Sequence, residues 1–450
     1  MTAETFRGSS SDRLAALSSQ AHPPLSRALP AVLLGIGLIG PLQSPAVHAQ
    51  AWTPTVPANR PAGPAWAMLP PSPPPALAEP RLAGEVSCPT LQQRLMTTIG
   101  AESSVWSVTV ADSSGRLLAD VNGLQPRLPA SNQKLLSTAF ALDRLGPDFR
   151  LTTQLWRLSD GTLRLTGQGD PDLAVPQLQR FAKLVATTSG GQPVRLELAE
   201  LPAQAWWPEA WPSGDRGASY GAPITRLAIT SNVIDEAVMN PPARLRTLLS
   251  RALSQQGAQA SVNLVDANMP LPRDAVLVHE EPSTTMQGLL SLANTESHNF
   301  TAEVLLRTAA GTWNLAEASR AESDWLSNQG LPMQGVRIDD GSGLSRTNRL
   351  TSRFLAALLL RMDQHPFGRD YIGSMAIAGR RGTLRHLFNG SSLDGRLFAK
   401  TGTLTGVRSI SGVLQTNDGP RYVSAISNGA AAPNRTIGSI LSQVQNVSLC

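Results

Sequence analysis

The stretch that decides the fold reads Pro129-Ala130-Ser131-Asn132-Gln133-Lys134, and a helical pattern of apolar residues runs from it to Gly146-Pro147. Two strand-like runs, residues 105–111 and 116–122, precede it. A spacing of three places Ser131 and Lys134 on one face of the helix, one turn apart. Serine is a poor nucleophile until a base takes its proton, and a desolvated lysine near other cations can serve as that base. The motif therefore indicates nucleophilic catalysis; the alternative is a helix-capping serine beside a surface lysine.

Lysine is rare in this chain. Of 38 basic residues only three are lysines, at positions 134, 183 and 400. Arginine stays protonated in a protein, whereas a buried lysine can lose its proton, so the retained lysines are candidates for chemistry. The sequence Lys400-Thr401-Gly402-Thr403 falls on a predicted strand, residues 397–403. Lys400 and Thr401 could hold a carboxylate, and Gly402 would leave room for an extended substrate along the strand. The alternative is an ordinary turn at the end of a strand.

A third short motif, Ser297-His298-Asn299, precedes a predicted helix at residues 300–310. In an extended segment Ser297 and Asn299 point the same way. Alone, this motif is equally well explained as a helix N-cap. In the order S-x-x-K, S-x-N, K-T-G, however, the three motifs form the set found in class A β-lactamases and penicillin-binding proteins.

The residues around these motifs narrow the resemblance. Together they are similar to the class C low-molecular-mass penicillin-binding proteins, the D-alanyl-D-alanine carboxypeptidase/endopeptidase family S13, from about residue 81 to the C-terminus. The resemblance implies an α/β (α+β) serine β-lactamase/DD-peptidase (transpeptidase-like) fold, with an antiparallel sheet flanked by helices and one inserted smaller domain. The matching segments are Pro129 to Lys134, Gly169-Asp170-Pro171, Asp340 to Arg346, Ala378-Gly379 with Gly382-Thr383-Leu384, and Ala399 to Leu404.

The resemblance also implies a role for each catalytic candidate. Ser131 would be the acylated nucleophile and Lys134 its base. Ser297 would pass a proton toward the leaving amine, and Asn299 would hold the substrate amide. Lys400 would bind the terminal carboxylate of the substrate.

Further residues are implied in substrate binding. Thr401 would share the carboxylate with Lys400, and the N–H of Thr403 would complete an oxyanion hole with that of the nucleophile. Arg346 resembles a family arginine near the side-chain end of the substrate. Asp215, in the segment 211–215, is the candidate that binds the free amino group of the peptide's diamino acid, with Tyr220 as its aromatic neighbour. A surface aspartate and a tyrosine at the edge of the core are the alternatives for these two.

The implied function is a serine carboxypeptidase, or an endopeptidase, that acts on peptidoglycan stem peptides through an acyl-enzyme. β-Lactams would be covalent inhibitors. A β-lactamase is a second possibility, but class A enzymes deacylate with an extra glutamate, and no Glu-x-x-x-Asn lies between Ser297 and Lys400. A non-catalytic wall-binding protein on the same fold is a third, although a binder has no need of a nucleophile and a base.

The chain divides into several predicted segments. Residues 1–49 resemble a signal peptide with cleavage after Ala49, so we expect an exported, periplasmic protein; an uncleaved anchor is the alternative. Residues 50–80 form a Pro/Ala-rich linker. We expect the peptidase domain at 81–150 and 238–450 and the inserted domain at 151–237. Cys88 and Cys450 are either bridged or free thiols.

The composition excludes several classes of protein. With 41% hydrophobic and 16% charged residues the chain is globular. It has no apolar stretch of about 18 residues that could span a membrane in the mature form. No run of basic residues suits nucleic acid. The six histidines lack metal-ligand spacing, so we predict no metal and no other cofactor.

Overall fold

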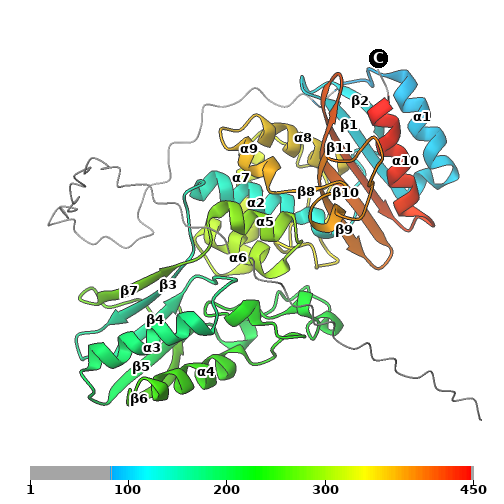
Figure 1. Ribbon diagram of the computed structural model, residues 1–450. Helices are drawn as coiled ribbons and strands as arrows, with labels where there is room; N and C mark the ends of the chain where they lie inside the picture. The colour runs from blue at the N-terminus through cyan, green and yellow to red at the C-terminus, as the bar shows by residue number, and fades with distance from the viewer. Residues whose placement is uncertain (1–81, 83, 447–449) are drawn as a thin grey trace, which may run out of the picture. The chain divides into compact units, whose positions relative to one another are not determined.

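The computed structural model of the chain describes residues 82, 84–446 and 450 (Figure 1). All of them belong to one compact unit, Pro64–Cys450. The predicted signal peptide, residues 1–49, and the predicted linker, residues 50–80, lie outside the described residues. Within the described part of the chain, no helix has the length and apolarity that a membrane span requires.

A six-stranded sheet forms the centre of the predicted peptidase domain, and all its neighbouring strands are antiparallel. The second strand of the sheet, β1 (Trp106–Asp112), is buried along its whole length, because helices cover both faces of the sheet. This arrangement confirms the predicted antiparallel sheet flanked by helices. In sheet order the strands are β2 (Leu117–Val121), β1 (Trp106–Asp112), β11 (Gly419–Asn428), β10 (Val407–Thr416), β9 (Leu397–Leu404) and β8 (Ala376–Ile377).

One face of this sheet is covered by α1 (Pro89–Ile99) and α10 (Pro433–Asn446), which lie side by side (Figure 1). Alternate residues of β1 point into the apolar cluster on this face, as the period of a strand requires. Cys88, just before α1, and Cys450 form a disulfide, which settles the alternative left open by the sequence. The bridge ties the start of the described chain to its last residue.

The opposite face carries the helices that hold the candidate catalytic residues. Their apolar sides form the largest core cluster of the described chain, and α8 packs directly against β1, β10 and β11. Gly146 ends α2, as the sequence predicts. These helices are α2 (Lys134–Leu145), α5 (Met286–Asn294), α6 (Asn299–Ala310), α7 (Leu315–Asn328), α8 (Ser352–Asp363) and α9 (Gly368–Gly373).

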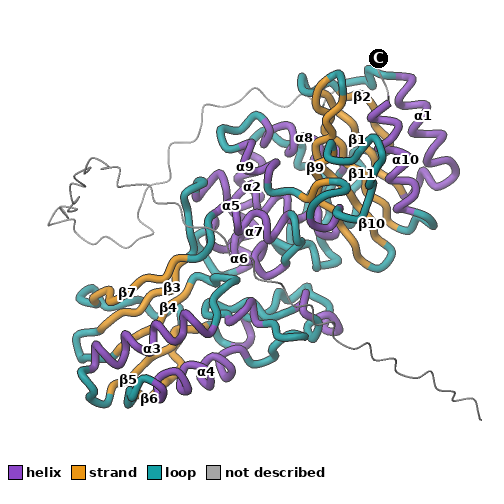
Figure 2. Tube along the Cα trace, in the orientation of Figure 1, coloured by secondary structure: helices purple, strands orange, loops and turns teal. Residues whose placement is uncertain are grey.

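A second sheet has five strands in the order β6-β5-β4-β3-β7 (Figure 2). The pairs β4–β5 and β5–β6 are parallel, whereas β3 is antiparallel to both neighbours. Two helices, α3 (Val175–Ser189) and α4 (Pro241–Gln255), pack on it around a separate apolar cluster. The strands are β3 (Thr152–Arg157), β4 (Leu163–Gly167), β5 (Val194–Glu200), β6 (Ala260–Asp266) and β7 (Val276–Pro282).

This sheet extends beyond the predicted end of the inserted domain. The sequence places that boundary at residues 237–238, but α4, β6 and β7 follow it and complete the sheet. The two edge strands hydrogen-bond to β5 and β3, so they cannot belong to the other sheet. We propose residues 151–282 as the inserted unit.

Candidate functional site

Ser131 lies in a tight turn that leads directly into helix α2 and packs against strands β9 and β10. Residues Ala130–Gln133 form a short 3-10 turn directly before α2, and Ala130 adopts a left-handed φ of 49°. The turn is held from the sheet, because the Ser409 hydroxyl donates to the Pro129 carbonyl at 2.6 Å. Gly343 allows a second close approach, since a Cβ there would lie 1.9 Å from the Ala130 carbonyl oxygen. Ser131 itself is half-buried.

Lys134 is fully buried and contacts the predicted nucleophile. Its Nζ donates to Ser131 Oγ at 3.0 Å, to Asn299 Oδ1 at 2.6 Å and to the Ser342 carbonyl at 2.6 Å. Burial lowers the pKa of Lys134 to about 7, although the negative charges of Asp340 and Glu303 oppose this shift. A lysine with such a pKa is neutral in a large part of the molecules at neutral pH. It can therefore accept a proton from Ser131.

The Ser297-His298-Asn299 motif lies at the start of α6. Ser297 has a left-handed φ of 63°, and Asn299 is the first helical residue. The Asn299 amide donates to the Tyr220 carbonyl at 2.7 Å while its oxygen accepts from the lysine. Burial and the nearby charge of Lys134 lower the pKa of His298 to about 4. The imidazole is therefore neutral near pH 7.

Lys400 lies on β9, buried beside the site, with its Nζ donating to the Thr401 carbonyl at 2.9 Å. Burial, and then the charge of Lys134, lower the pKa of Lys400 well below its usual range. The Thr401 hydroxyl donates to the Thr383 hydroxyl oxygen at 2.8 Å. This contact connects the Lys-Thr-Gly strand to the 382–384 turn that the resemblance also singled out.

Gly402 has a packing role that the sequence analysis did not predict. A Cβ at this position would lie 2.1 Å from Ser409 Oγ and 2.7 Å from the Pro129 carbonyl oxygen. The glycine therefore makes room for the turn that carries Ser131. Room for an extended substrate along the strand, the role predicted for this glycine, stays a prediction.

One pocket of about 590 Å³ brings seven of the predicted residues together. Lys134 and Lys400 are buried and do not line it, and neither do Thr401 and Gly402. Residues 404–406 of the β9–β10 connection form another part of the wall. The seven predicted residues in the lining are Ser131, Asp215, Tyr220, Ser297, Asn299, Arg346 and Thr403.

The rim of this pocket is polar and open to solvent. The Tyr220 hydroxyl donates to Asp215 Oδ1 at 3.0 Å, and this hydrogen bond raises the pKa of the tyrosine. Tyr220 is 52% exposed, so it is not a tyrosine at the edge of the core. Arg346 donates from Nη1 to the Thr405 carbonyl at 3.3 Å. Within the described residues, no cluster of His, Cys, Asp or Glu is placed to hold a metal ion.

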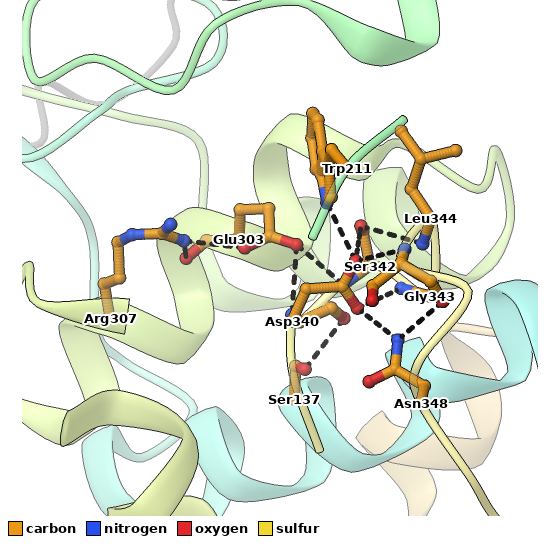
Figure 3. Close-up of polar contacts among 11 residues, drawn as sticks. Ser137, Trp211, Glu303, Arg307, Asp340, Ser342, Gly343, Leu344 and Asn348 are labelled. Atoms are coloured by element: carbon orange, nitrogen blue, oxygen red, sulfur yellow. Dashed lines mark hydrogen bonds and ion pairs between the residues drawn. The ribbon is translucent and has the colours of Figure 1, made fainter. Parts of the chain in front are cut away.

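The sequence analysis assigned no role to a buried polar network behind Lys134 (Figure 3). In this network Glu303 and Arg307 of α6 form an ion pair at 2.7 Å, and both are buried. Asp340 accepts a hydrogen bond from Trp211 Nε1 at 2.8 Å. The available signal was charge spacing: a glutamate and an arginine four residues apart on a helix that is otherwise apolar.

Comparisons with known proteins agree along most of the chain. A family model described as the D-Ala-D-Ala carboxypeptidase 3 (S13) family matches residues 91–240 and 233–445. The D-alanyl-D-alanine carboxypeptidase of Actinomadura sp. (strain R39) is 27% identical over 428 residues, with 74% of this chain and 79% of that protein covered. Carboxypeptidase DacB of Mycolicibacterium smegmatis is 28% identical over 417 residues, with 84% and 89% covered.

Solved structures share the fold. The crystal structure of penicillin binding protein 4 from Haemophilus influenzae matches with a TM-score of 0.68 at 18% identity, covering 79% of this chain and 98% of that one. A predatory peptidoglycan endopeptidase from Bdellovibrio bacteriovorus matches with a TM-score of 0.52 at 17% identity, covering 76% and 90%. These likenesses confirm the fold that the sequence resemblance implied.

Proposed function

Because this chain belongs to the D-Ala-D-Ala carboxypeptidase 3 (S13) family, we propose that its reaction is hydrolysis of a terminal D-alanine through an acyl-enzyme on Ser131. Membership confirms the resemblance that the sequence motifs carried. The observation that supports the proposal most directly is the 3.0 Å contact between Lys134 Nζ and Ser131 Oγ. Since the lysine is buried and its pKa is lowered to about 7, a base lies next to the nucleophile.

In the first half of the reaction, neutral Lys134 takes the hydroxyl proton while Ser131 Oγ attacks the carbonyl carbon of the scissile peptide bond. The backbone N–H groups of Ser131 and Thr403 stabilise the oxyanion that forms. The C–N bond then breaks, and the leaving amine receives the proton from Lys134 by way of the Ser297 hydroxyl. In the second half, water attacks the ester, and the peptide leaves as a carboxylate while Oγ regains a proton.

Three residues position the substrate near the nucleophile. Lys400 and the Thr401 hydroxyl bind the terminal carboxylate, and this negative charge raises the pKa of Lys400 again. The amide of Asn299, which donates to the Tyr220 carbonyl at 2.7 Å, is the group that holds the substrate amide. The substrate carbonyl replaces the tyrosine carbonyl as its acceptor.

At the rim, the side chain of the substrate's diamino acid reaches the polar groups of the pocket. Asp215 accepts from the free amino group, since its carboxylate lies in the lining beside the Tyr220 hydroxyl. Arg346 lies near the same end of the substrate. The substrate class is the peptidoglycan stem peptide, and β-lactams acylate Ser131 as they would any enzyme of this mechanism.

The site of action follows from this substrate. An exported enzyme, released into the periplasm after cleavage of the signal peptide, meets its peptide in the cell wall. Endopeptidase activity uses the same steps, with the amine of a neighbouring stem as the leaving group. One solved structure of similar fold carries the description of a peptidoglycan endopeptidase.

The test compares the protein with its Ser131→Ala variant. Each is incubated with a fluorescent penicillin, weighed by intact mass spectrometry and assayed for D-alanine release from a pentapeptide. Ser254→Ala on the exposed side of α4 is the matched control, because it removes a hydroxyl from the chain far from the pocket lining. We expect label and D-alanine release in the protein and the control, and neither in Ser131→Ala.

Other outcomes would change the proposal. A label that turns over within seconds would favour a β-lactamase. Folded protein that takes up no label and releases no D-alanine would refute the enzyme and favour a wall-binding protein. Label that persists in Ser131→Ala would show that another residue is the nucleophile.

A further inference from the structure

The Ser342 carbonyl is a fixed acceptor for the base. It lies 2.6 Å from Lys134 Nζ, a shorter contact than the 3.0 Å from this nitrogen to Ser131 Oγ. Ser342 belongs to the loop 340–345, which is buried throughout. The orientation of this peptide therefore decides how the lysine nitrogen is directed toward the nucleophile. Figure 3 shows that two carboxylates hold the loop.

The first carboxylate belongs to Glu303, one turn after Asn299 on α6. Its Oε1 accepts from the N–H of Gly341 at 3.0 Å and from the N–H of Ser342 at 2.9 Å. Its Oε2 accepts from Arg307 Nη1 at 2.7 Å. Burial raises the pKa of Glu303, but the arginine opposes this, and each of these three contacts is a donor directed at the carboxylate. This is the environment of an ionised carboxylate.

The second carboxylate, Asp340, closes the loop on itself. It accepts from the N–H of Gly343 at 2.8 Å, from the N–H of Ser345 at 2.8 Å and from the Asn348 amide at 2.7 Å. These bonds define the shape of the loop. They do not attach it to α6, the helix that begins with the Asn299 ligand of the lysine. Glu303 makes that attachment, since it binds the N–H groups of Gly341 and Ser342, whereas Asp340 binds the Gly343 N–H in the same peptide unit as the Ser342 carbonyl.

We propose that Glu303 is a positioning residue for acylation: its carboxylate holds the Ser342 carbonyl against Lys134 Nζ and keeps a negative charge beside the base. The inference rests on the proposed function, in which Lys134 accepts the proton of Ser131. Arg307 is the counter-ion that makes a charge at this depth tolerable. The carboxylate touches neither substrate nor reacting atoms, so its effect reaches the reaction only through the lysine.

The charges around Lys134 give the sign of the expected effect. Glu303 from α6 and Asp340 from the loop raise its pKa against the effect of burial. Lys400 from β9 and His298 before α6 also face this region, and the lysine lowers the pKa of both. Removing the charge of Glu303 therefore lowers the pKa of Lys134 further. The acid limb of the acylation rate then moves to lower pH, by about one unit.

The remaining neighbours do not supply the same charge. Glu322 from α7 is fully buried, burial raises its pKa well above the usual range, and it is not among the charges that shift the pKa of Lys134. Tyr371 from α9 is neutral, because burial raises its pKa, and its hydroxyl donates to the Leu135 carbonyl at 2.8 Å. Arg307 is not among the charges that shift the pKa of Lys134. The double variant described next should therefore shift the profile in the same direction as the single one.

The experiment measures the second-order rate of acylation by a fluorescent penicillin between pH 5.5 and 9, together with the melting temperature. The variants are Glu303→Gln, whose amide oxygen still accepts from the loop, and Glu303→Gln/Arg307→Met, which removes both charges. The second guards against misfolding, because replacing a whole buried ion pair costs far less stability than breaking it. The control is Glu281→Gln/Arg180→Met, which removes an ion pair of the second sheet.

We expect the midpoint of the acid limb to fall by about one pH unit in both Glu303 variants and to stay unchanged in the control. The rate at the plateau should also fall, by about tenfold or more, because a neutral amide holds the two N–H groups less strongly than a carboxylate and therefore directs the lysine less firmly. An unchanged midpoint and plateau with a lower melting temperature would overturn the inference and leave Glu303 a purely structural residue. If the protein itself is not acylated, the proposed function fails and the inference fails with it.

Discussion

Replacing Gly402 by alanine tests whether β9 sets the position of the nucleophile. The added Cβ would lie 2.7 Å from the Pro129 carbonyl oxygen and 2.1 Å from Ser409 Oγ. Ser409 cannot simply rotate away, because its hydroxyl donates to that same carbonyl at 2.6 Å. Ordinary contact begins at 3.4 Å, so the turn that carries Ser131 must retreat by about 0.7 Å, the difference between 3.4 and 2.7 Å.

A displacement of this size should affect catalysis more than stability. Misplacing a reacting group by about 1 Å can reduce a rate about 100-fold, so we expect acylation by penicillin to slow by at least about tenfold. Crowding in a packed region costs about 1–3 kcal/mol, which should leave the protein folded at 25 °C. The assay is the acylation rate per mole of folded protein, followed by intact mass, with the melting temperature measured in parallel.

Gly190→Ala is the matched control for this substitution. Gly190 ends α3 with a φ of 59° and has nothing within 4 Å of its added Cβ. Alanine there should cost about 1 kcal/mol through backbone strain alone and leave the acylation rate unchanged. A Gly402→Ala protein with a normal acylation rate and only a lower melting temperature would refute the reasoning. It would mean that the sheet yields and the Ser131 turn stays in place.

Two further predictions concern the base and the disulfide. Only neutral Lys134 can accept a proton, and its pKa is lowered to about 7. The rate of acylation, measured by penicillin labelling, should therefore rise between about pH 6 and 8. A rate that does not change with pH would contradict this. Cys88→Ser removes a bridge that spans 362 residues, and we expect a loss of roughly 2–5 kcal/mol in thermal unfolding. Acylation at 25 °C should stay normal, because Cys88 packs on the face of the sheet opposite the Ser131 helix; a loss of labelling in folded protein would show otherwise.

The short motifs predict those contacts that depend on helix and strand geometry, which is local. The spacing of three residues puts Ser131 and Lys134 on one face, where they meet at 3.0 Å. Asn299 and Ser342, distant in sequence, direct the lysine nitrogen. The hairpin between β10 and β11 is equally local, because the turn at residues 417–418 brings Thr416 opposite Gly419. The order of strands in the sheet was not predicted, since β1 pairs with β11 across most of the chain.

The second sheet could not be delimited in this way. Strands β6 and β7 form its edges and are mostly half-buried or exposed, so they lack the alternating apolar pattern of a strand with one buried face. The parallel pairing of β5 with β6 joins segments on either side of α4. The predicted domain ends at residue 237, before α4, whereas the hydrogen bonds of the sheet continue to Pro282.

The motifs that identify a catalytic site do not include the buried groups that set the pKa of its base. Lys134 is recognised in the sequence because it follows Ser131 by three residues. Its pKa, however, depends on burial and on two carboxylates, Glu303 and Asp340. Glu303 follows Asn299 by one helical turn, so the helix that presents a ligand to the lysine also carries the charge behind it. A charged residue at a helix position that must face the core is costly unless it is paired. Buried charge of this kind, with its partner Arg307 one turn further along, is therefore the signal to seek beside a nucleophile motif.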